Sequence, residues 1–190
     1  MNKIIDGRSA YERFQEVKNR IVSVVNRSFD FKFVDSPEII FHEAGGQISV
    51  SSGAVRLTAN DHELAFCIAH EISHTLRKHG EKTQAEFQEK WRQLTEAYYE
   101  EKKHLFTNTL LLAVGAGLLV LNKKARCRKQ ETEADLEAVL IMKQAGYDPS
   151  EVIWFVQTMG ADSFIESLFR DHPDGRTRAA NILAKIRDDK

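Results

Sequence analysis

The segment His70-Glu71-Ile72-Ser73-His74 (HEISH, residues 70–74) decides how the rest of the sequence is interpreted. It places two histidines four residues apart, with a glutamate directly after the first. On an α-helix, residues i and i+4 lie one above the other, so both imidazoles can reach the same metal ion. Such a short pattern also occurs by chance, so it needs a helix around it, a third ligand and supporting residues.

The sequence around this segment has the periodicity of an amphipathic helix over residues 63–79. Its apolar side chains fill one arc of the helix and can pack into a core. His70, Glu71 and His74 fall on the other side. The apolar arc consists of Leu64, Ala65, Ile68, Ala69, Ile72 and Leu76. The pattern therefore predicts a helix that packs by one face and presents its imidazoles on the other.

The downstream segment ETEAD (131–135) offers the third ligand that a catalytic zinc site requires beside its open water position. On a helix over residues 128–146, Glu131 and Asp135 fall within the apolar arc, whereas Glu133 falls opposite. A carboxylate on a buried face is costly unless it is paired or binds a metal. Glu131 is therefore the predicted third ligand. Asp135, one turn on, suits the free ring N–H of a ligand histidine, and Glu133 is expected to face solvent.

Three motifs in this order resemble a known protease family: HEISHTLRKHG (70–80), ETEAD (131–135) and DHPDGRTR (171–178). The sequence is similar to the gluzincin-type zinc metalloendopeptidases that include HtpX, BepA and the CAAX prenyl protease. Upstream, VDSPEIIFHEAGGQISVSSGAVRL (34–57) resembles that family's strand–Gly-Gly–strand segment. It departs from the family at Ile39-Ile40 and at Ala44, which replace the usual Asn-Ala and Pro. The resemblance implies an α+β, mostly helical, zincin-like domain with a small N-terminal β-sheet.

The resemblance also implies roles for individual residues. His70, His74 and Glu131 would bind one zinc ion, with Glu71 as the catalytic base and Asp135 in support. Glu71 would take a proton from water that attacks a peptide carbonyl, then return it to the leaving amine. The family's H-P histidine corresponds to His172, which would lie over the zinc and either block the water position or assist catalysis. Arg178 would anchor that loop.

An extended peptide or protein substrate is expected along an exposed strand edge, with residues 47–51 as the candidate strand. The main alternative function is a zinc-bound latent or chaperone-like binding module without turnover. Intact Glu71 argues against it, because a pure binding site needs no base beside the metal. A peptide deformylase would need an upstream cysteine ligand, and Cys67 lies on the same helix as the histidines. A helical interaction protein with a chance HExxH leaves the placement of Glu131 and Asp135 unexplained.

The apolar segment LFTNTLLLAVGAGLLVL (105–121) lies between the histidine pair and Glu131. A single membrane span there would place Glu131 across about 30 Å of hydrocarbon from the histidines. We therefore expect a helix that does not cross. Two alternatives remain open: a buried helix with close packing at Gly115 and Gly117, or contact with a membrane surface helped by the basic residues that follow.

The overall composition fits one metallopeptidase domain over residues 1–190. A net charge of -1 with both signs mixed along the chain excludes a typical nucleic-acid binder. Two cysteines, Cys67 and Cys127, provide no disulfide framework. The first residues lack the apolar core of a signal peptide, so a cytoplasmic protein, with or without membrane association, is expected. The sequence does not determine the oligomeric state.

The remaining elements follow from periodicity and from capping residues. Asn60 or Asp61 should cap the HEISH helix, with Gly80 ending it, and Gly146 should end the ETEAD helix. Other histidines are expected to be structural or solvated: His42, His62, His79 and His104. The predicted elements are an N-terminal helix (9–27, within 1–28), strands (29–35, 38–41, 47–51), and helices over 83–104, 105–121, 128–149, 149–170 and 174–187.

Overall fold

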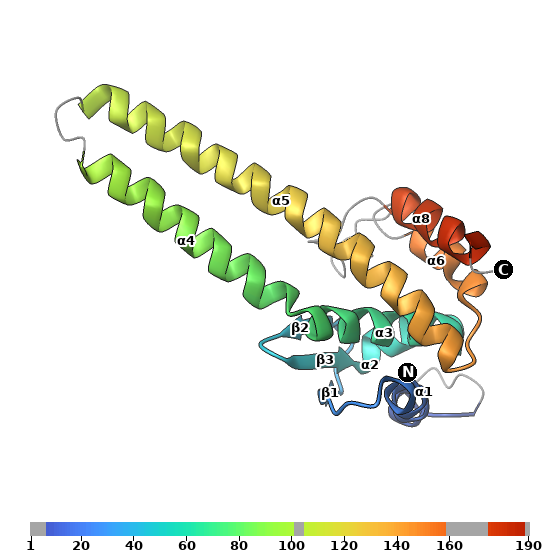
Figure 1. The fold of residues 1–190 in the computed structure, drawn as a ribbon. Coiled ribbons are helices and arrows are strands. Elements are labelled where there is room, and N and C mark those ends of the chain that lie inside the picture. Colours follow the sequence, from blue (N-terminus) through green and yellow to red (C-terminus); the bar gives the residue numbers. More distant parts are fainter. Residues whose placement is uncertain (1–6, 101–104, 159–174, 189–190) are drawn as a thin grey trace.

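A computed structural model of the chain describes residues 7–100, 105–158 and 175–188. A small three-stranded sheet lies beside a group of packed helices, and two long helices extend away from them (Figure 1). The architecture is α+β and mostly helical, which confirms the predicted fold class.

Helix α1 (Ala10–Val25) begins at a capping box in which Ser9 and Glu12 satisfy each other's backbone N–H groups. Its apolar face buries Phe14, Val17 and Ile21 against the core. The predicted N-terminal helix is therefore confirmed.

The sheet consists of β1 (Asp30–Val34), β2 (Phe41–Ala44) and β3 (Gln47–Ser51) in the order β1-β3-β2. Strand β3 is parallel to β1 and antiparallel to β2. Gly45 and Gly46 both adopt positive φ angles, as a two-residue hairpin turn requires. The turn places Ala44 opposite Gln47, so β2 continues up to the glycines. The prediction of this strand at 38–41 was therefore wrong, because the strand lies at 41–44.

Two helices follow the sheet directly: the short α2 (Ser52–Leu57), which the sequence analysis did not predict, and α3 (Asp61–Arg77). Asn60 caps α3 by accepting a hydrogen bond from the backbone N–H of Glu63. The helix ends at Lys78, which takes the left-handed conformation that was expected of Gly80. Gly80 instead lies in the first turn of the next helix.

Helix α3 is the centre of the fold and is buried on all sides over residues 63–73. The face predicted to present the imidazoles does present them to Glu131, but this face is covered by protein as well. The side that carries the histidines is covered by the second half of α5. Of the metal-binding candidates, His70 and Glu131 are consequently buried, and His74 is partly exposed.

Helices α4 (His79–Glu100) and α5 (Leu105–Gln144) form a long antiparallel pair (Figure 1). Helix α5 joins the predicted apolar and ETEAD helices into one element, and Gly146 with positive φ follows its end. We refer to α4 and residues 105–126 of α5 as the arm. Val114, Leu118 and Leu121 on the arm are exposed, which contradicts the buried-helix alternative for this part.

No helix in the ranges that the structure describes is both long enough and apolar enough to cross a membrane.

The chain closes with the 3₁₀ helix η1 (Pro149–Val152), α6 (Ile153–Thr158) and α8 (Gly175–Asp188). Asp148 caps η1. Helix α6 covers the start of the helix predicted at 149–170, whose remainder lies outside the described residues. Helix α8 agrees with the predicted final helix, and it packs on α5 and α6. Its position brings Arg178 to the same region as the second half of α5.

Candidate metal centre

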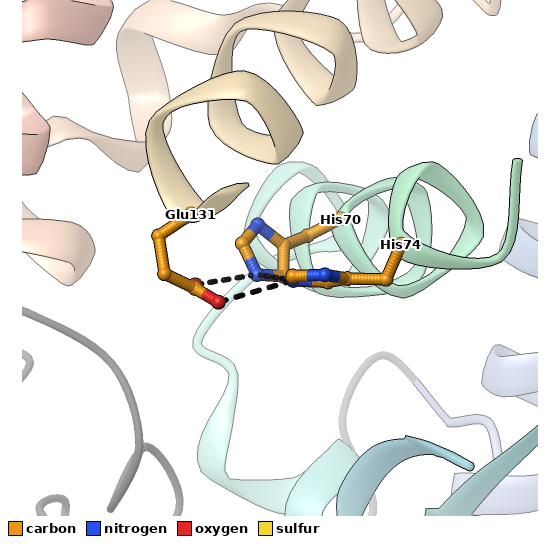
Figure 2. A group of neighbouring side chains, drawn as sticks. All are labelled: His70, His74 and Glu131. Carbon is orange, nitrogen blue, oxygen red and sulfur yellow. Dashed lines mark hydrogen bonds and ion pairs between the residues drawn. The ribbon is translucent and has the colours of Figure 1, made fainter. Parts of the chain in front are cut away.

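Two helices bring the three predicted ligands together (Figure 2). Helix α3 supplies His70 and His74 from successive turns, and α5 supplies Glu131. The Nε2 atoms of the two histidines lie 3.0 Å apart. The Glu131 carboxylate oxygens lie 3.2 Å from His70 Nε2 and 3.3 Å from His74 Nε2. Two nitrogens and one oxygen therefore converge on one point inside the protein.

This donor set fits a zinc ion. Two imidazole nitrogens and a carboxylate are ligands that zinc takes in catalytic sites, with a fourth position for water. Zinc–ligand bonds of about 2.0–2.1 Å at tetrahedral angles separate the ligand atoms by roughly 3.3 Å. The distances here, 3.0 to 3.3 Å, are close to that separation. A cation would also offset the cost of burying Glu131, which is 5% exposed.

His70 lies between two carboxylates. Burial disfavours the charged imidazole, but hydrogen bonds and attraction from Asp135 and Glu131 outweigh this effect and raise the pKa of His70 to about 10. The protein without metal therefore keeps His70 protonated, and binding of a metal must release that proton.

Asp135 connects His70 to the last helix. Its Oδ1 lies 3.0 Å from His70 Nδ1. Arg178 on α8 donates two hydrogen bonds to the same carboxylate, at 2.7 and 2.8 Å. Burial raises the pKa of Asp135, but the charge and hydrogen bonds of Arg178 prevail and lower it to about 2. A fully buried carboxylate thus stays charged and faces the ring nitrogen of His70 that points away from Glu131.

Two further predicted site residues, Glu71 and Arg178, lie in the described part of the chain. Glu71 follows His70 on α3 and is 4% exposed. Arg178 was expected to anchor the loop of His172, and in the structure its guanidinium binds Asp135. His172 lies outside the described residues, so its predicted role stays a prediction.

Sequence reasoning missed His79, which was expected to be ordinary. It begins α4 directly after the left-handed Lys78, and it is 4% exposed. Its Nδ1 lies 3.0 Å from Nδ1 of His74, and its Nε2 lies 3.4 Å from Glu133. Burial and the neighbouring His74 lower the pKa of His79 to about 4, so its imidazole is neutral. The repeated spacing of four and five residues from His70 to His79 was the available signal.

Two of the described histidines, His42 and His62, lie outside this group. His62 accepts a hydrogen bond from the backbone N–H of Asp148 and packs edge-on against Tyr147, which is a structural role. His42 lies on β2. His104 lies outside the described residues.

Comparison with known proteins agrees with the geometry. Residues 12–186 match the model of peptidase family M48. The chain is also 28% identical over 161 residues to the beta-barrel assembly-enhancing protease of Yersinia pestis. That alignment covers 76% of this chain but only 32% of the relative, so the chain spans about a third of the length of that curated protein. The family match covers nearly the whole chain, all of the sheet and both ligand helices, and the chain therefore belongs to peptidase family M48.

Proposed function

We propose that the chain is a zinc-dependent metalloendopeptidase that binds one zinc ion through His70, His74 and Glu131. The observation that carries this proposal is the convergence of three ligand atoms from α3 and α5 within 4.8 Å of one another. Membership of a peptidase family supports hydrolysis of peptide bonds as the reaction.

The zinc ion, when bound, would lower the pKa of a coordinated water towards about 7 and polarise the substrate carbonyl. Glu71 is the base in this proposal, because it directly follows the first ligand on the same helix. Its Oε atoms would accept the proton of the attacking water and later deliver a proton to the leaving amine. Asp135 and Arg178 would hold the ring of His70 in the orientation that directs Nε2 towards the metal.

The substrate would pair with an edge strand of the sheet. The strand proposed from the sequence, 47–51, was wrong for this role, because β3 is hydrogen-bonded on both sides and has no free edge. Strand β2 is at the edge and lies against α3. An extended peptide beside β2 would gain backbone hydrogen bonds close to the helix that carries His70 and His74.

The proposal is tested by measuring zinc content and the cleavage of unfolded casein for the wild type, Glu71→Gln and Glu63→Gln. Glu63 is a second buried glutamate on α3, and its carboxylate accepts a hydrogen bond from the backbone N–H of Ala59. It therefore serves as a matched control for the same chemical change. We expect all three proteins to bind about one zinc, and only Glu71→Gln to lose cleavage, by at least 100-fold.

The possible outcomes of this experiment distinguish an active peptidase from a latent or binding module. Zinc binding without cleavage by the wild type would favour a latent or binding module over an active peptidase. A wild type without zinc would remove the basis of the proposal. Cleavage by Glu71→Gln at the wild-type rate would reject Glu71 as the base.

A further inference from the structure

The outer side of the arm carries a line of exposed apolar side chains. Val114, Leu118 and Leu121 are 54%, 55% and 62% exposed. They follow each other at helical spacings of four and three residues, so they lie on one side of α5. The neighbouring side of α5 contacts α4, where Gly115 lies against Leu94. The exposed line therefore lies outside the contact with α4, and we refer to Val114, Leu118 and Leu121 as the apolar stripe.

Basic residues continue the stripe towards the body of the protein. Arg128 and Lys129 are exposed and both lie about two turns beyond Leu121, on the same side of the helix. Lys129 lies 3.9 Å from the carboxylate of Glu133. Residues 105–130 contain five Lys or Arg and no Asp or Glu, in a chain with 28 acidic residues. One side of a projecting helix is thus apolar and then cationic, without an acidic residue of its own.

These features favour a surface that combines apolar and anionic groups. A second copy of the chain, pairing through the same run, would bring no acidic residue to meet these cations. Anionic lipids provide acyl chains for Leu118 and Leu121 and phosphates for Arg128 and Lys129. We propose that the apolar stripe and these two cations bind the surface of an anionic lipid bilayer.

The charges of α4 determine how the arm lies on the bilayer. Arg92 forms ion pairs with Glu89 and Glu96 on an exposed part of α4. Immersing these groups in hydrocarbon would be costly, so the arm lies along the interface with α4 on the water side. From Val114 to Lys129 the contact would extend about 22 Å, at 1.5 Å per residue.

The test is flotation of the whole chain with vesicles of neutral phosphatidylcholine, and with vesicles that contain 30 mol% phosphatidylglycerol, about a third of the lipid. One variant is Val114→Gln/Leu118→Gln/Leu121→Gln and the other is Arg128→Gln/Lys129→Gln. The controls are Leu140→Gln/Trp154→Gln and Arg27→Gln/Lys32→Gln, which change exposed apolar and basic residues elsewhere. Circular dichroism shows whether each variant keeps its helices.

We expect the wild type and both controls to bind the anionic vesicles and to release as salt rises. The charge variant should bind about 30-fold more weakly, since each cation contributes roughly fivefold, and the stripe variant should not float. The proposal would be overturned if all five proteins floated equally well with the anionic vesicles, or if the wild type did not float with them. Equal binding to neutral vesicles would overturn the role of anionic lipid. Self-association without lipid that the stripe variant abolishes would assign the surface to a second copy and overturn it as well.

A separate observation concerns the second ligand histidine. The two ligand histidines have matching surroundings: Asp135 meets Nδ1 of His70, and His79 meets Nδ1 of His74. When His74 binds a metal through Nε2, its proton must be on Nδ1. With the proton of His79 on Nε2, its Nδ1 can accept this hydrogen bond from His74, and its Nε2–H then points towards Glu133, 3.4 Å away. One continuous arrangement of donors and acceptors satisfies all three side chains.

We infer that His79 is a positioning residue, which fixes the tautomer and orientation of His74 with Glu133 behind it. This inference rests on the proposed zinc site, but its test does not depend on cleavage. Zinc affinity is measured by competition with a chromophoric chelator, and geometry by the visible spectrum of the Co²⁺-substituted protein. The variants are His79→Leu, His79→Gln and Glu133→Gln. Glutamine can accept from His74 and donate to Glu133, whereas leucine only fills the space.

We expect His79→Leu to bind zinc 10- to 100-fold more weakly with an altered Co²⁺ spectrum, and His79→Gln to stay within a few-fold of the wild type. Glu133→Gln should weaken binding several-fold and tests the relay even if a substitution at His79 prevents folding. Wild-type affinity in both His79→Leu and Glu133→Gln would overturn the inference. Equal loss in the two His79 variants, with Glu133→Gln unaffected, would mean that the imidazole ring is needed for a reason other than the hydrogen bonds to His74 and Glu133, and would also overturn the inference. A wild type without zinc would instead refute the zinc site itself.

Discussion

At the scale of single residues, the region around His70 holds several charges that water cannot reach. Asp135 and Arg178 are 0% and 2% exposed, and each makes the burial of the other tolerable. Removing one partner of such a pair leaves an uncompensated charge, whereas removing both does not. The pair therefore links the last helix to His70 through a contact that is costly to break from one side only.

The first prediction is a double-mutant cycle on this pair. Arg178→Met alone should destabilise the protein without metal by about 3–5 kcal/mol, because the Asp135 carboxylate loses its strongest partner. Arg178→Met with Asp135→Leu should cost clearly less than the sum of the two single changes. Urea unfolding in the presence of a chelator measures all four free energies. Additive costs within about 0.5 kcal/mol would contradict the coupling.

How far the sequence predicts this site depends on the residue. Glu131 and Asp135 could be predicted because a carboxylate within an apolar arc needs a partner, and the structure brings both to His70. His79 could not be found in this way. Its position depends on the left-handed Lys78, which turns the chain between α3 and α4, and a continuous helical wheel does not contain that turn.

At the scale of elements, one ion-pair group joins the start of α3 to α1. Arg13 is buried, and its Nε donates a hydrogen bond to Asp61 at 2.7 Å. Its Nη1 donates to the backbone carbonyl of Val55 in α2 and to that of Thr58, which follows α2. Arg8 also donates to Asp61. Burial raises the pKa of Asp61, but the hydrogen bonds and charges of Arg13 and Arg8 together lower it. Asp61 therefore stabilises the fold only while it is ionised.

The second prediction follows from that pKa. Asp61→Asn should lose about 2 kcal/mol near neutral pH, as for a hydrogen bond to a charged group. Because the pKa is lower in the folded state, the stabilisation is present above about pH 4 and disappears as the pH falls further. The difference from the wild type should therefore narrow in acid. Urea unfolding from pH 7 to pH 3, with the exposed Asp188→Asn as control, measures it. A constant difference over this range would exclude the ionised Asp61 as its cause.

The third prediction concerns β2 as the substrate strand. In a two-residue hairpin, Ala44–Gln47 and His42–Ser49 exchange hydrogen bonds, so the backbone N–H of Glu43 points to the free edge. Glu43→Pro removes that N–H, and Glu43→Ala removes only the side chain. We expect Glu43→Pro to lower kcat/KM about tenfold relative to Glu43→Ala, with zinc content unchanged, as one hydrogen bond would give. Equal kcat/KM in the two variants would exclude pairing at this position.

The elements differ in how well the sequence predicts them. Capping residues and periodicity located α1, α3 and the final helix because those signals are local. The joining of residues 105–121 to the ETEAD helix was not predictable from the same signals. The change from apolar to basic residues near Lys123 suggested a boundary, but no glycine or proline interrupts the helix there. The change of composition marks where the arm leaves the body, not where a helix ends.

At the scale of the whole molecule, the proposed metal joins parts of the chain that are distant in sequence. His74 is at the end of α3 and Glu131 begins the part of α5 that packs on it, with the whole arm between them. Without a cation, Glu131 pairs with a protonated His70 at this junction. Occupation of the site by zinc should therefore stabilise the domain rather than only activate it.

The last prediction is the size of that stabilisation. A ligand that binds only the folded state at 100 times its Kd adds about 2.7 kcal/mol. For a chain of this size, that corresponds to a rise in Tm of roughly 5–10 °C. Differential scanning calorimetry with excess zinc, and with a chelator, measures the shift. The variant Glu131→Gln should show a much smaller shift in Tm, because its amide oxygen is a weaker ligand. The control Glu137→Gln changes a glutamate on a different side of α5, and its shift should match that of the wild type. An equal shift in Glu131→Gln would mean that zinc stabilises the protein from another site, and α5 would then not be a ligand helix.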